Sequence, residues 1–421
     1  MKTLKYPTKE QTAKALERPM QDDTALSSRV QEIISQVRTG GDPSLLKLSR
    51  ELDGFSGERF EISPSEMKAA AGLVSQYLKD AIDLARQNIE RFHAVQRPED
   101  ISLVTQPGVY CSMQFKPLQK VGLYIPGGTA PLLSTVLMLA VPALVAGCSE
   151  LVICTPPEPG PELLYTLSLF NARVFRLGGA QAIAAMAFGT DTIPRVDKIF
   201  GPGNRYVTEA KMQLSTMGIA IDMPAGPSEM LVIADATANP AFVAADLLSQ
   251  AEHGADSQVV LITDSEKMLE ATLKELEEQV STLPRRDIAL QCLENSTAIL
   301  VKDLSEAMEI SNDYAPEHLI LALEKPAAIK PMVENAGSVF MGHYTPESLG
   351  DYSSGTNHTL PTAGAARSWS GVSLLSFMKT ITFQEATPEG LDRLANATTI
   401  LARAEGLEAH ARAIEVRKSQ F

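Results

Sequence analysis

The spacing of hydrophobic residues along the chain changes close to residue 120. Before this point, apolar residues recur at helical spacing over 29–37 and 66–92, which predicts helices. Beyond it, short apolar runs end in glycine or proline and alternate with longer helical stretches. This alternation predicts parallel sheets with helices packed on their faces, which is the α/β class.

Two strand, turn and helix units follow one another in the middle of the chain. In the first, a strand over 120–125 leads through a Pro-Gly-Gly turn into a helix over about 130–146 and then into another strand. In the second, a strand over 174–177 leads through two glycines into a helix over 180–188. Strands joined by helices in this way predict a nucleotide-type domain over about 121–223.

The glycine-rich turns do not contain a complete dinucleotide-binding fingerprint. The run Gly201-Pro202-Gly203-Asn204-Arg205-Tyr206 has no third glycine at the required spacing, so this motif alone does not establish a Rossmann fold. Further apolar runs over about 230–370 predict another α/β block. The tail from Thr387 is rich in alanine and glutamate, and we expect it to be helical.

One long stretch, 121–149, contains no charged residue and could cross a membrane by its length. Pro126, Pro131 and Pro142 interrupt it, so we expect a buried part of the α/β core instead. The first ten residues carry three lysines without an apolar segment, which does not fit a secretory signal. We therefore expect a cytoplasmic protein that makes no use of a membrane.

Composition restricts the possible partners and chemistry. The net charge is −14 and the isoelectric point about 5.0, opposite to the clustered basic surface that binds nucleic acid or anionic membranes. The four cysteines form no CxxC pair, so no disulfide framework is expected. Cys148 and Cys154 lie in apolar sequence, where a thiolate is disfavoured, so a nucleophilic cysteine is not favoured either.

Five of the six histidines lie after residue 250, close to carboxylates and glycines. Gln250 and His253 are three residues apart at the expected end of a helix capped by Asn239, so they share one face. A helix C-terminus favours a cation, but this spacing is equally typical of an exposed helix end. Glu405 and His410, in the tail, are likewise typical of the solvent face of a terminal helix.

Two further segments carry groups suited to catalysis. Adjacent Glu317 and His318 are either a general acid–base pair or the solvated start of a helix. The polar loop from Ser348 to His358 holds Asp351, whose carboxylate is a hard oxygen ligand. Glycine-bearing polar loops often hold binding sites, although the same composition is found in ordinary surface loops.

Together these segments resemble the histidinol dehydrogenase family over nearly the whole chain. Many long ordered matches make the resemblance specific. They are Val121 to Gly128, Gly178 to Ile183, Lys198 to Asn204, Asp222 to Glu229, Gln250 to Gly254, Tyr314 to Leu319 and Gly350 to His358.

The resemblance implies an α/β fold with two incomplete Rossmann-like parallel-sheet domains and small helical N- and C-terminal pieces. We place an N-terminal segment at 1–20 and a first, catalytic α/β domain at 21–120 with 229–372. A second Rossmann-like domain that contacts NAD is placed at 121–228. The helical tail over 373–421 is expected to reach the partner subunit of a homodimer.

The resemblance also assigns functional positions. The implied zinc ligands are Gln250, His253, Asp351 and, from the partner subunit, His410. The implied catalytic pair is Glu317 and His318. The substrate, L-histidinol, would contact the zinc positions and His318, as well as Ser228, His358 and Glu405. The implied NAD contacts are Tyr124, Gln181 and Asn204.

The activity implied is the NAD-dependent, four-electron oxidation of L-histidinol through histidinaldehyde to L-histidine. In this scheme Zn²⁺ orients the substrate, a neutral His318 accepts the hydroxyl proton, and Glu317 activates water. His358 would hydrogen-bond the developing alkoxide or carboxylate.

Three alternatives remain at this point. The chain could oxidise another amino- or sulfo-alcohol on the same scaffold, bind zinc and NAD as a regulator without turnover, or act as a cysteine-dependent aldehyde dehydrogenase. The presence of His358, Glu405 and His410 together favours histidinol, because the resemblance links them to that substrate.

Overall fold

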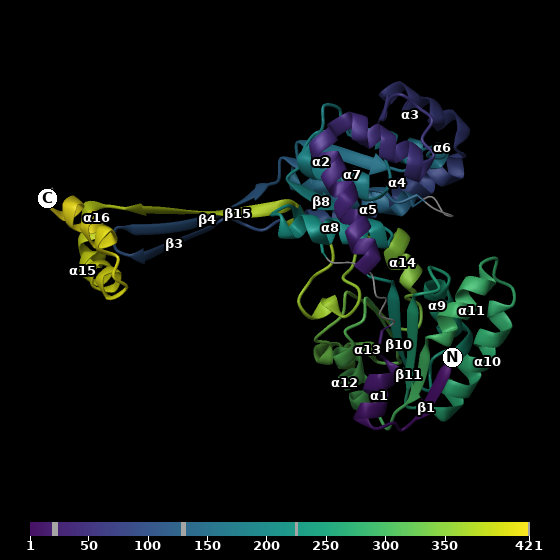
Figure 1. The fold of residues 1–421 in the computed structure, drawn as a ribbon. Helices are drawn as coiled ribbons and strands as arrows, with labels where there is room; N and C mark the ends of the chain where they lie inside the picture. Colours follow the sequence, from purple (N-terminus) through teal and green to yellow (C-terminus); the bar gives the residue numbers. More distant parts are fainter. Residues whose placement is uncertain (19–23, 128–131, 224–225, 420–421) are drawn as a thin grey trace.

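Two α/β bodies, stacked one above the other, and a thin projecting arm make up the computed structural model of this chain (Figure 1). The structure describes residues 1–18, 24–127, 132–223 and 226–419. Each body contains a six-stranded sheet, and the arm contains a three-stranded one. The expected α/β class with parallel sheets is therefore confirmed.

The sheet of the first body has the strand order β2-β7-β6-β5-β8-β9. All neighbouring pairs are parallel except the pair β2–β7. Its strands are β2 (Glu61–Ile62), β5 (Lys120–Tyr124), β6 (Glu150–Thr155), β7 (Arg173–Arg176), β8 (Lys198–Phe200) and β9 (Ala220–Ile221).

Helices cover both faces of this sheet, so its central strands are buried on both sides, as parallel strands usually are. In β5, Val121 and Leu123 point into one core, whereas Tyr124 points into the other. The helices on the first face are α3 (Pro64–Ala70), α4 (Gln76–Ala94), α5 (Leu133–Ala146) and α6 (Pro161–Ser168). Those on the second are α2 (Thr24–Asp53), α7 (Gly179–Phe188) and α8 (Arg205–Thr216).

The sheet of the second body is parallel throughout, in the order β1-β12-β11-β10-β13-β14. Its strands are β1 (Lys2–Lys5), β10 (Glu229–Ala234), β11 (Gln258–Thr263), β12 (Thr297–Leu300), β13 (His318–Ala322) and β14 (Ser338–Met341). The helices of this body are α1 (Lys9–Ala15), α9 (Pro240–Ala251), α10 (Glu266–Val280), α11 (Arg286–Glu294), α12 (Leu304–Tyr314), α13 (Pro326–Ile329) and α14 (Glu347–Tyr352).

Residues 24–94 pack differently from the expected grouping with 229–372. Their helices form the two cores of the first body, and β2 pairs with β7 there. A helical pattern shows which face of a helix is buried but not which sheet buries it. The apolar pattern over 66–92 also covers two helices, because the chain leaves α3 through a short 3₁₀ turn and Ser75 then caps α4.

The arm joins two distant parts of the sequence. Strands β3 (Ile101–Gln106) and β4 (Val109–Pro117) form a hairpin, and β15 (Met378–Ala386) pairs antiparallel with β4. Helices α15 (Pro388–Ala404) and α16 (Glu408–Lys418) then lie at its far end, well away from both bodies (Figure 1). The segment 373–421 is therefore not wholly helical, since it begins with a 3₁₀ turn and a long strand.

The charge-free stretch contains β5 and α5, and its described residues are largely buried. Gly128 and the expected start of the helix near residue 130 lie outside the described residues. In the part of the chain that the structure describes, no helix has the length and apolar character needed to span a bilayer. Four 3₁₀ turns are present, at Ala71–Leu73, Lys330–Met332, Ala365–Arg367 and Leu374–Phe377.

Gly201 lets two strands of the first sheet end side by side. Its φ is +125°, and a Cβ atom there would lie 2.1 Å from the backbone oxygen of Tyr124. Neither atom can move without displacing the end of β5 or β8. Gly218 also has a positive φ, +85°, but a Cβ atom there would meet nothing within 4 Å.

Gly201→Ala should therefore destabilise the protein much more than Gly218→Ala. The control substitution adds only backbone strain, about 1 kcal/mol, whereas the clash at Gly201 should bring the cost above about 2 kcal/mol. Thermal unfolding followed by circular dichroism measures both. Equal losses in Tm would contradict the close approach at Gly201.

Candidate active site

A cavity of about 750 Å³ lies where the two bodies face each other. From the first body it is lined by Pro126, just after β5, and by the loop from Pro202 to Arg205 after β8. These are the carboxyl ends of two adjacent strands from which the chain continues in opposite directions, the position where open parallel sheets bind ligands.

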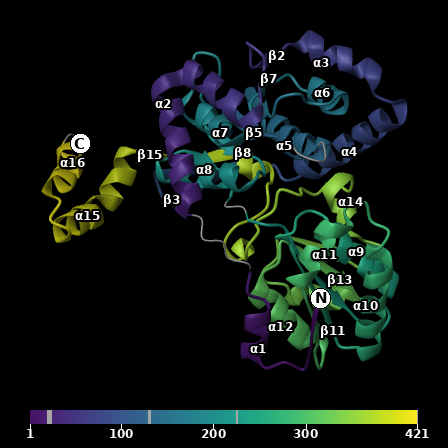
Figure 2. The same cartoon turned by 45° about the vertical axis from the view of Figure 1, so that its right-hand side comes forward.

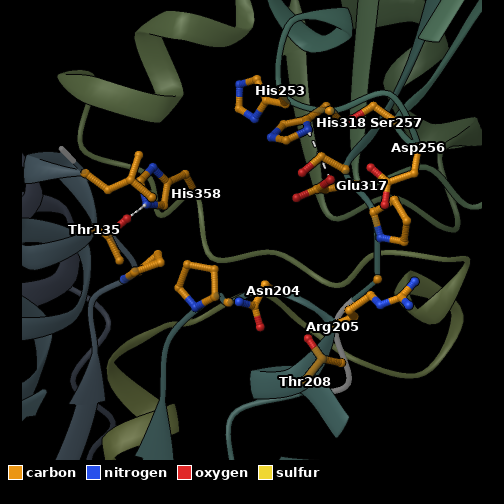
Figure 3. Close-up of a pocket in the computed structure, with 18 of the residues that line it drawn as sticks. Thr135, Asn204, Arg205, Thr208, His253, Asp256, Ser257, Glu317, His318 and His358 are labelled. Carbon is orange, nitrogen blue, oxygen red and sulfur yellow. Dashed lines mark hydrogen bonds and ion pairs between the residues drawn. The ribbon is translucent and has the colours of Figure 1, made fainter. Parts of the chain in front are cut away.

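The second body contributes groups from the amino ends of its strands. Ser228 precedes β10, Ser257 precedes β11, and Glu317 and His318 stand at the start of β13. Figure 3 shows His253, Glu317 and His318 grouped on this side, with His358 across the cavity.

Seven of the predicted site residues line this one cavity. They are Asn204, Ser228, His253, Glu317, His318, Asp351 and His358. The structure thus brings together segments that lie up to about 150 residues apart in sequence.

Glu317 and His318 are buried, with 5% and 3% of their surface exposed. They begin a strand, so the alternative of a solvated helix start is wrong. The carboxylate of Glu317 accepts a hydrogen bond from the Glu229 backbone N–H at 3.0 Å. His318 Nδ1 lies 3.3 Å from the Glu229 carbonyl oxygen and 3.3 Å from Oε1 of Glu347.

Glu347 was not identified from the sequence. It is buried in the first turn of α14, and Ser249 donates a hydrogen bond to its other oxygen at 3.1 Å. The sequence placed it only near a polar loop, because a contact across 29 residues from His318 has no local pattern. His318 Nε2 lies on the opposite side of the ring, 3.7 Å from Asp351.

The electrostatics of this cluster are set by burial and by its excess of carboxylates. Burial raises the pKa of Glu317 to about 8 and that of Glu347 to about 7. Burial alone would lower the pKa of His318, but the Glu347 and Glu317 carboxylates outweigh it and raise this pKa to about 10. The carboxylates around His318 thus favour its protonated ring, whereas the role expected from the sequence needs the neutral one.

Three of the four predicted zinc ligands lie near one another. Gln250 is in the last turn of α9, and His253 follows the end of that helix, with its N–H bonded to the Gln250 carbonyl at 3.2 Å. Burial lowers the pKa of His253, which favours the neutral imidazole that a metal requires. Asp351 interacts electrostatically with both His253 and His318.

Several buried polar atoms in this region bear on whether its residues could hold a cation. Both amide atoms of the Gln250 side chain are buried without a hydrogen-bond partner among the described residues, as are Nε2 of His318 and Oε1 of Glu347. Buried polar atoms are rarely left unpaired, so a bound ion or ligand is a physical reason for them. Ligand atoms of His318, Glu347 and Asp351 also lie within 4.8 Å of one another.

The tail residues do not reach the cavity of their own chain. Glu405 ends α15 and His410 lies in α16, and both are exposed. Figure 1 shows these helices at the far tip of the arm, and Figure 2 shows them apart from both bodies in a second view. Within one chain, therefore, His410 is separated from the other three predicted ligands.

The predicted NAD contacts fall into two groups. The Tyr124 hydroxyl accepts a hydrogen bond from the Gly179 N–H at 3.0 Å, and the Gln181 amide donates to Asp53 at 2.9 Å. Both of these hydrogen bonds involve residues in the first turn of α7. Asn204 instead lines the cavity and caps α8 through its side-chain oxygen. Sequence reasoning did not identify Asp53, which also accepts from the Gly178 N–H.

A buried ion pair holds the loop that carries Asn204. Lys211 Nζ pairs with the Asp222 carboxylate and donates to the Gly201 carbonyl at 2.8 Å. The other oxygen of Asp222 accepts from the Gly201 N–H, also at 2.8 Å. Both sides of this glycine are thus bonded, which fixes the start of the loop at the cavity wall.

The cysteines do not form part of this site. Cys148, Cys154 and Cys292 are buried, and burial raises the pKa of each thiol, that of Cys148 to about 12. None of the four lines the cavity. This agrees with the expectation from sequence that a cysteine nucleophile is not favoured.

Two α/β bodies with largely parallel sheets, which meet at a cavity that holds a buried glutamate–histidine pair, are typical of an α/β enzyme. The profile of the family described as histidinol dehydrogenase matches residues 16–418. A histidinol dehydrogenase of Bacteroides thetaiotaomicron is 53% identical over 99% of both chains, and one of Xanthomonas euvesicatoria is 53% identical over 96% of this chain and 95% of the relative.

The solved structure of histidinol dehydrogenase from Elizabethkingia anophelis superposes with a TM-score of 0.97 at 47% identity, covering 100% of this chain and 98% of the other. The chain belongs to the histidinol dehydrogenase family and is an oxidoreductase.

Proposed function

We propose that this chain oxidises L-histidinol through histidinaldehyde to L-histidine, the last step of histidine biosynthesis, in the cytoplasm. One zinc ion per subunit and two NAD molecules per turnover are part of the proposal. The observation that carries it is the buried Glu317–His318 pair, which lines one cavity with His253, Asp351 and His358.

The overall change requires two oxidations at one carbon. The alcohol R–CH₂OH, two NAD⁺ and one water give R–COO⁻, two NADH and three protons. Each oxidation removes a hydride and a proton, and water supplies the second oxygen between them. A site for this sequence needs a group that removes hydroxyl protons and a group that deprotonates water.

Zinc would be held by Gln250, His253, Asp351 and the partner subunit's His410, a nitrogen- and oxygen-rich set that suits this ion. When bound, zinc would supply ligation of the substrate's imidazole and amino nitrogens, which orients the carbinol carbon. Ser228, His358 and the partner subunit's Glu405 would make further contacts with the substrate. Tyr124, Gln181 and Asn204 would contact NAD.

His318 is the proposed base for the hydroxyl proton. Its Nδ1 faces the Glu229 carbonyl oxygen and Glu347, so Nε2 is the nitrogen available toward Asp351 and the cavity. Asp351 is one of the carboxylates that stabilise the protonated ring. If Asp351 bound a cation, the cation would offset the negative charge of this carboxylate. The pKa of His318 would then fall toward neutrality.

Glu317 is the proposed activator of water. Its pKa of about 8 is close to neutrality, as a general base requires. The Glu229 N–H holds one carboxylate oxygen, so the carboxylate has a fixed orientation at the cavity edge. The first half-reaction needs a base for the hydroxyl proton of the alcohol, and the second needs a base for water. Two separate residues, His318 and Glu317, fit these two needs.

The arm supports a dimer. Its strands and helices expose many large apolar side chains without burying them in their own chain. They are Ile101, Leu103, Val104, Tyr110, Ile381, Phe383, Leu394, Ile400, Leu401, Leu407 and Val416. A projecting apolar surface of this kind is typical of a segment that packs on a partner.

Other assignments make different predictions. A relative that oxidises another amino-alcohol would not prefer L-histidinol, and a zinc- and NAD-binding regulator would give no NADH. A cysteine-dependent enzyme would lose activity on thiol alkylation.

Removal of the metal should abolish turnover. The protein should produce NADH from L-histidinol, and a chelator should stop this until Zn²⁺ is restored, because substrate orientation depends on the ion. His253→Ala should lose bound zinc, measured by elemental analysis, and remain folded. Full zinc content with full activity in this variant would refute the ligand assignment.

Glu317→Gln should separate the two half-reactions. Removal of a general base typically slows its own step about 10²- to 10⁴-fold. We expect this loss in the oxidation of supplied histidinaldehyde and a much smaller one in alcohol oxidation, both followed as NADH in single-turnover experiments. His318→Ala is the matched comparison and should slow alcohol oxidation most. A normal aldehyde rate in Glu317→Gln would show that another group activates water.

Two inactive variants should complement each other if the site is shared. A His410→Ala chain paired with a His253→Ala chain places both lesions in one composite site and leaves the other intact. Random pairing makes about half of the dimers hybrid, so roughly a quarter of wild-type activity should return. Differential tags would confirm the hybrids after co-expression. If confirmed hybrids stayed as inactive as both parents, His410 would act within its own chain.

A further inference from the structure

Arg18, just after α1, binds a residue that the proposed mechanism does not use. Its Nε and one terminal nitrogen donate to the two carboxylate oxygens of Glu229, at 2.6 and 2.8 Å. The same terminal nitrogen donates to the Tyr314 carbonyl at 2.7 Å, and the guanidinium lies 4.1 Å from the centre of the Tyr314 ring. Arg18 therefore joins the N-terminal segment to two points of the second body.

Glu229 needs this partner because it is buried. Only 3% of its side-chain surface is exposed, compared with 27% for Arg18. A carboxylate at this depth is strongly disfavoured unless a cation and hydrogen bonds offset the loss of water. The paired, planar geometry of the guanidinium fixes the orientation of the carboxylate as well as its charge.

The backbone of Glu229 contacts both residues of the proposed catalytic pair. Its N–H donates to Glu317 Oε2 at 3.0 Å, and its carbonyl oxygen lies 3.3 Å from His318 Nδ1. Glu229 is the first residue of β10; it pairs with Gln258 of β11, whereas the pairing with β13 begins one residue later, at Met230. A shift of the Glu229 backbone would move a hydrogen-bond partner of each residue of the pair.

Arg18 does not itself touch the active-site cavity. It lines a separate cavity of about 260 Å³ between α1 and α12, with Lys9, Thr12 and Tyr314 among the other lining residues. Any effect of Arg18 on catalysis must therefore pass through Glu229 or Tyr314.

We infer that Arg18 is a positioning residue, which orients the Glu317–His318 pair by holding the side chain of Glu229. The inference rests on the roles proposed above for that pair. It makes the N-terminal segment part of the catalytic apparatus, although the segment lies outside the cavity.

Arg18→Met should lower kcat about 10- to 100-fold, the usual effect of removing a group that orients a functional residue. The zinc content should stay unchanged, because none of the proposed zinc ligands is bonded to Glu229, and the loss should appear in kcat more than in the KM for L-histidinol. Arg18→Lys keeps the charge but not the two parallel bonds, and should recover only part of the loss. Lys9→Met removes a cation from the same cavity wall without touching Glu229 and should behave as wild type.

Guanidinium should restore activity to Arg18→Ala, because the missing group opens onto the cavity beside α1. Millimolar guanidinium chloride should raise the kcat of this variant several-fold, and equal sodium chloride should not. Failure of both this rescue and the partial recovery in Arg18→Lys, in folded protein, would overturn the inference. An unchanged kcat in Arg18→Met would also overturn the inference. A loss of activity in this variant that is accompanied by equal changes in KM, zinc content and Tm would overturn it as well.

One readout does not depend on turnover. The ring ¹⁵N resonances of His318, assigned by comparison with His318→Gln, should shift in Arg18→Met but not in Lys9→Met. If wild-type protein produced no NADH from histidinol, the proposed function would fail, while a shift of these resonances would still support the positioning by Arg18. Unchanged resonances together with normal turnover would refute the positioning alone.

Discussion

The arrangement of this protein depends on one energetically unfavourable feature, which is that the imidazole of His318 is buried among carboxylates. His318 has Glu317, Glu347 and Asp351 within 4 Å, in a region with almost no exposure to solvent. So much negative charge cannot be buried without compensation. The carboxylates raise the pKa of the His318 imidazole, so that a protonated ring offsets part of this charge, and both amide atoms of the buried Gln250 side chain have no hydrogen-bond partner among the described residues. A cation at this point would satisfy what the polypeptide leaves unsatisfied.

The two bodies face this cluster with opposite ends of their sheets. The first body presents the carboxyl ends of β5 and β8, where backbone turns leave room for a ligand. The second presents the amino ends of β10, β11 and β13, which bring side chains rather than turns to the cavity. His358 connects the two, since its ring nitrogens contact Asp351 in the second body and Thr135 in the first. The turns of the first body and the side chains of the second thus meet at one cavity, with Asn204 on one side and Glu317 and His318 on the other.

Local pattern was sufficient for the regular elements. The apolar runs that predicted strands over 120–125 and 174–177 became β5 and β7 within one or two residues, because strands buried on both faces have few polar positions to obscure them. The hairpin of β3 and β4 was missed, although Val109, Cys111, Met113 and Phe115 alternate with other residues along β4. Strand β3 is exposed along its length and β4 is mostly half-buried, so neither is one of the continuous apolar runs by which buried strands are recognised.

Contacts between residues that are distant in sequence limited how much of the site could be predicted from the sequence. The residues that lie in the cavity were recognised through the family resemblance, since Gln250 with His253, or Glu317 with His318, is ambiguous by spacing alone. Glu347, Glu229 and Asp53 were not found. Each acts through a neighbour that is distant in sequence, such as His318 for Glu347 or Gln181 for Asp53, and no periodicity reports such a pairing. The same reason explains why residues 24–94 were assigned to the wrong sheet.

The position of the tail gives the remaining constraint on the site. The arm is a three-stranded sheet, and nine consecutive residues of β15 pair with β4, so α15 and α16 cannot turn back toward the cavity without breaking that ladder. The apolar surface of the arm is also exposed along its length. Burying this surface on a second chain would bring Glu405 and His410 to a cavity that lacks them. A dimer formed through the arm would therefore complete the metal site and cover the apolar surface by a single association, which is why we expect assembly and metal binding to depend on each other.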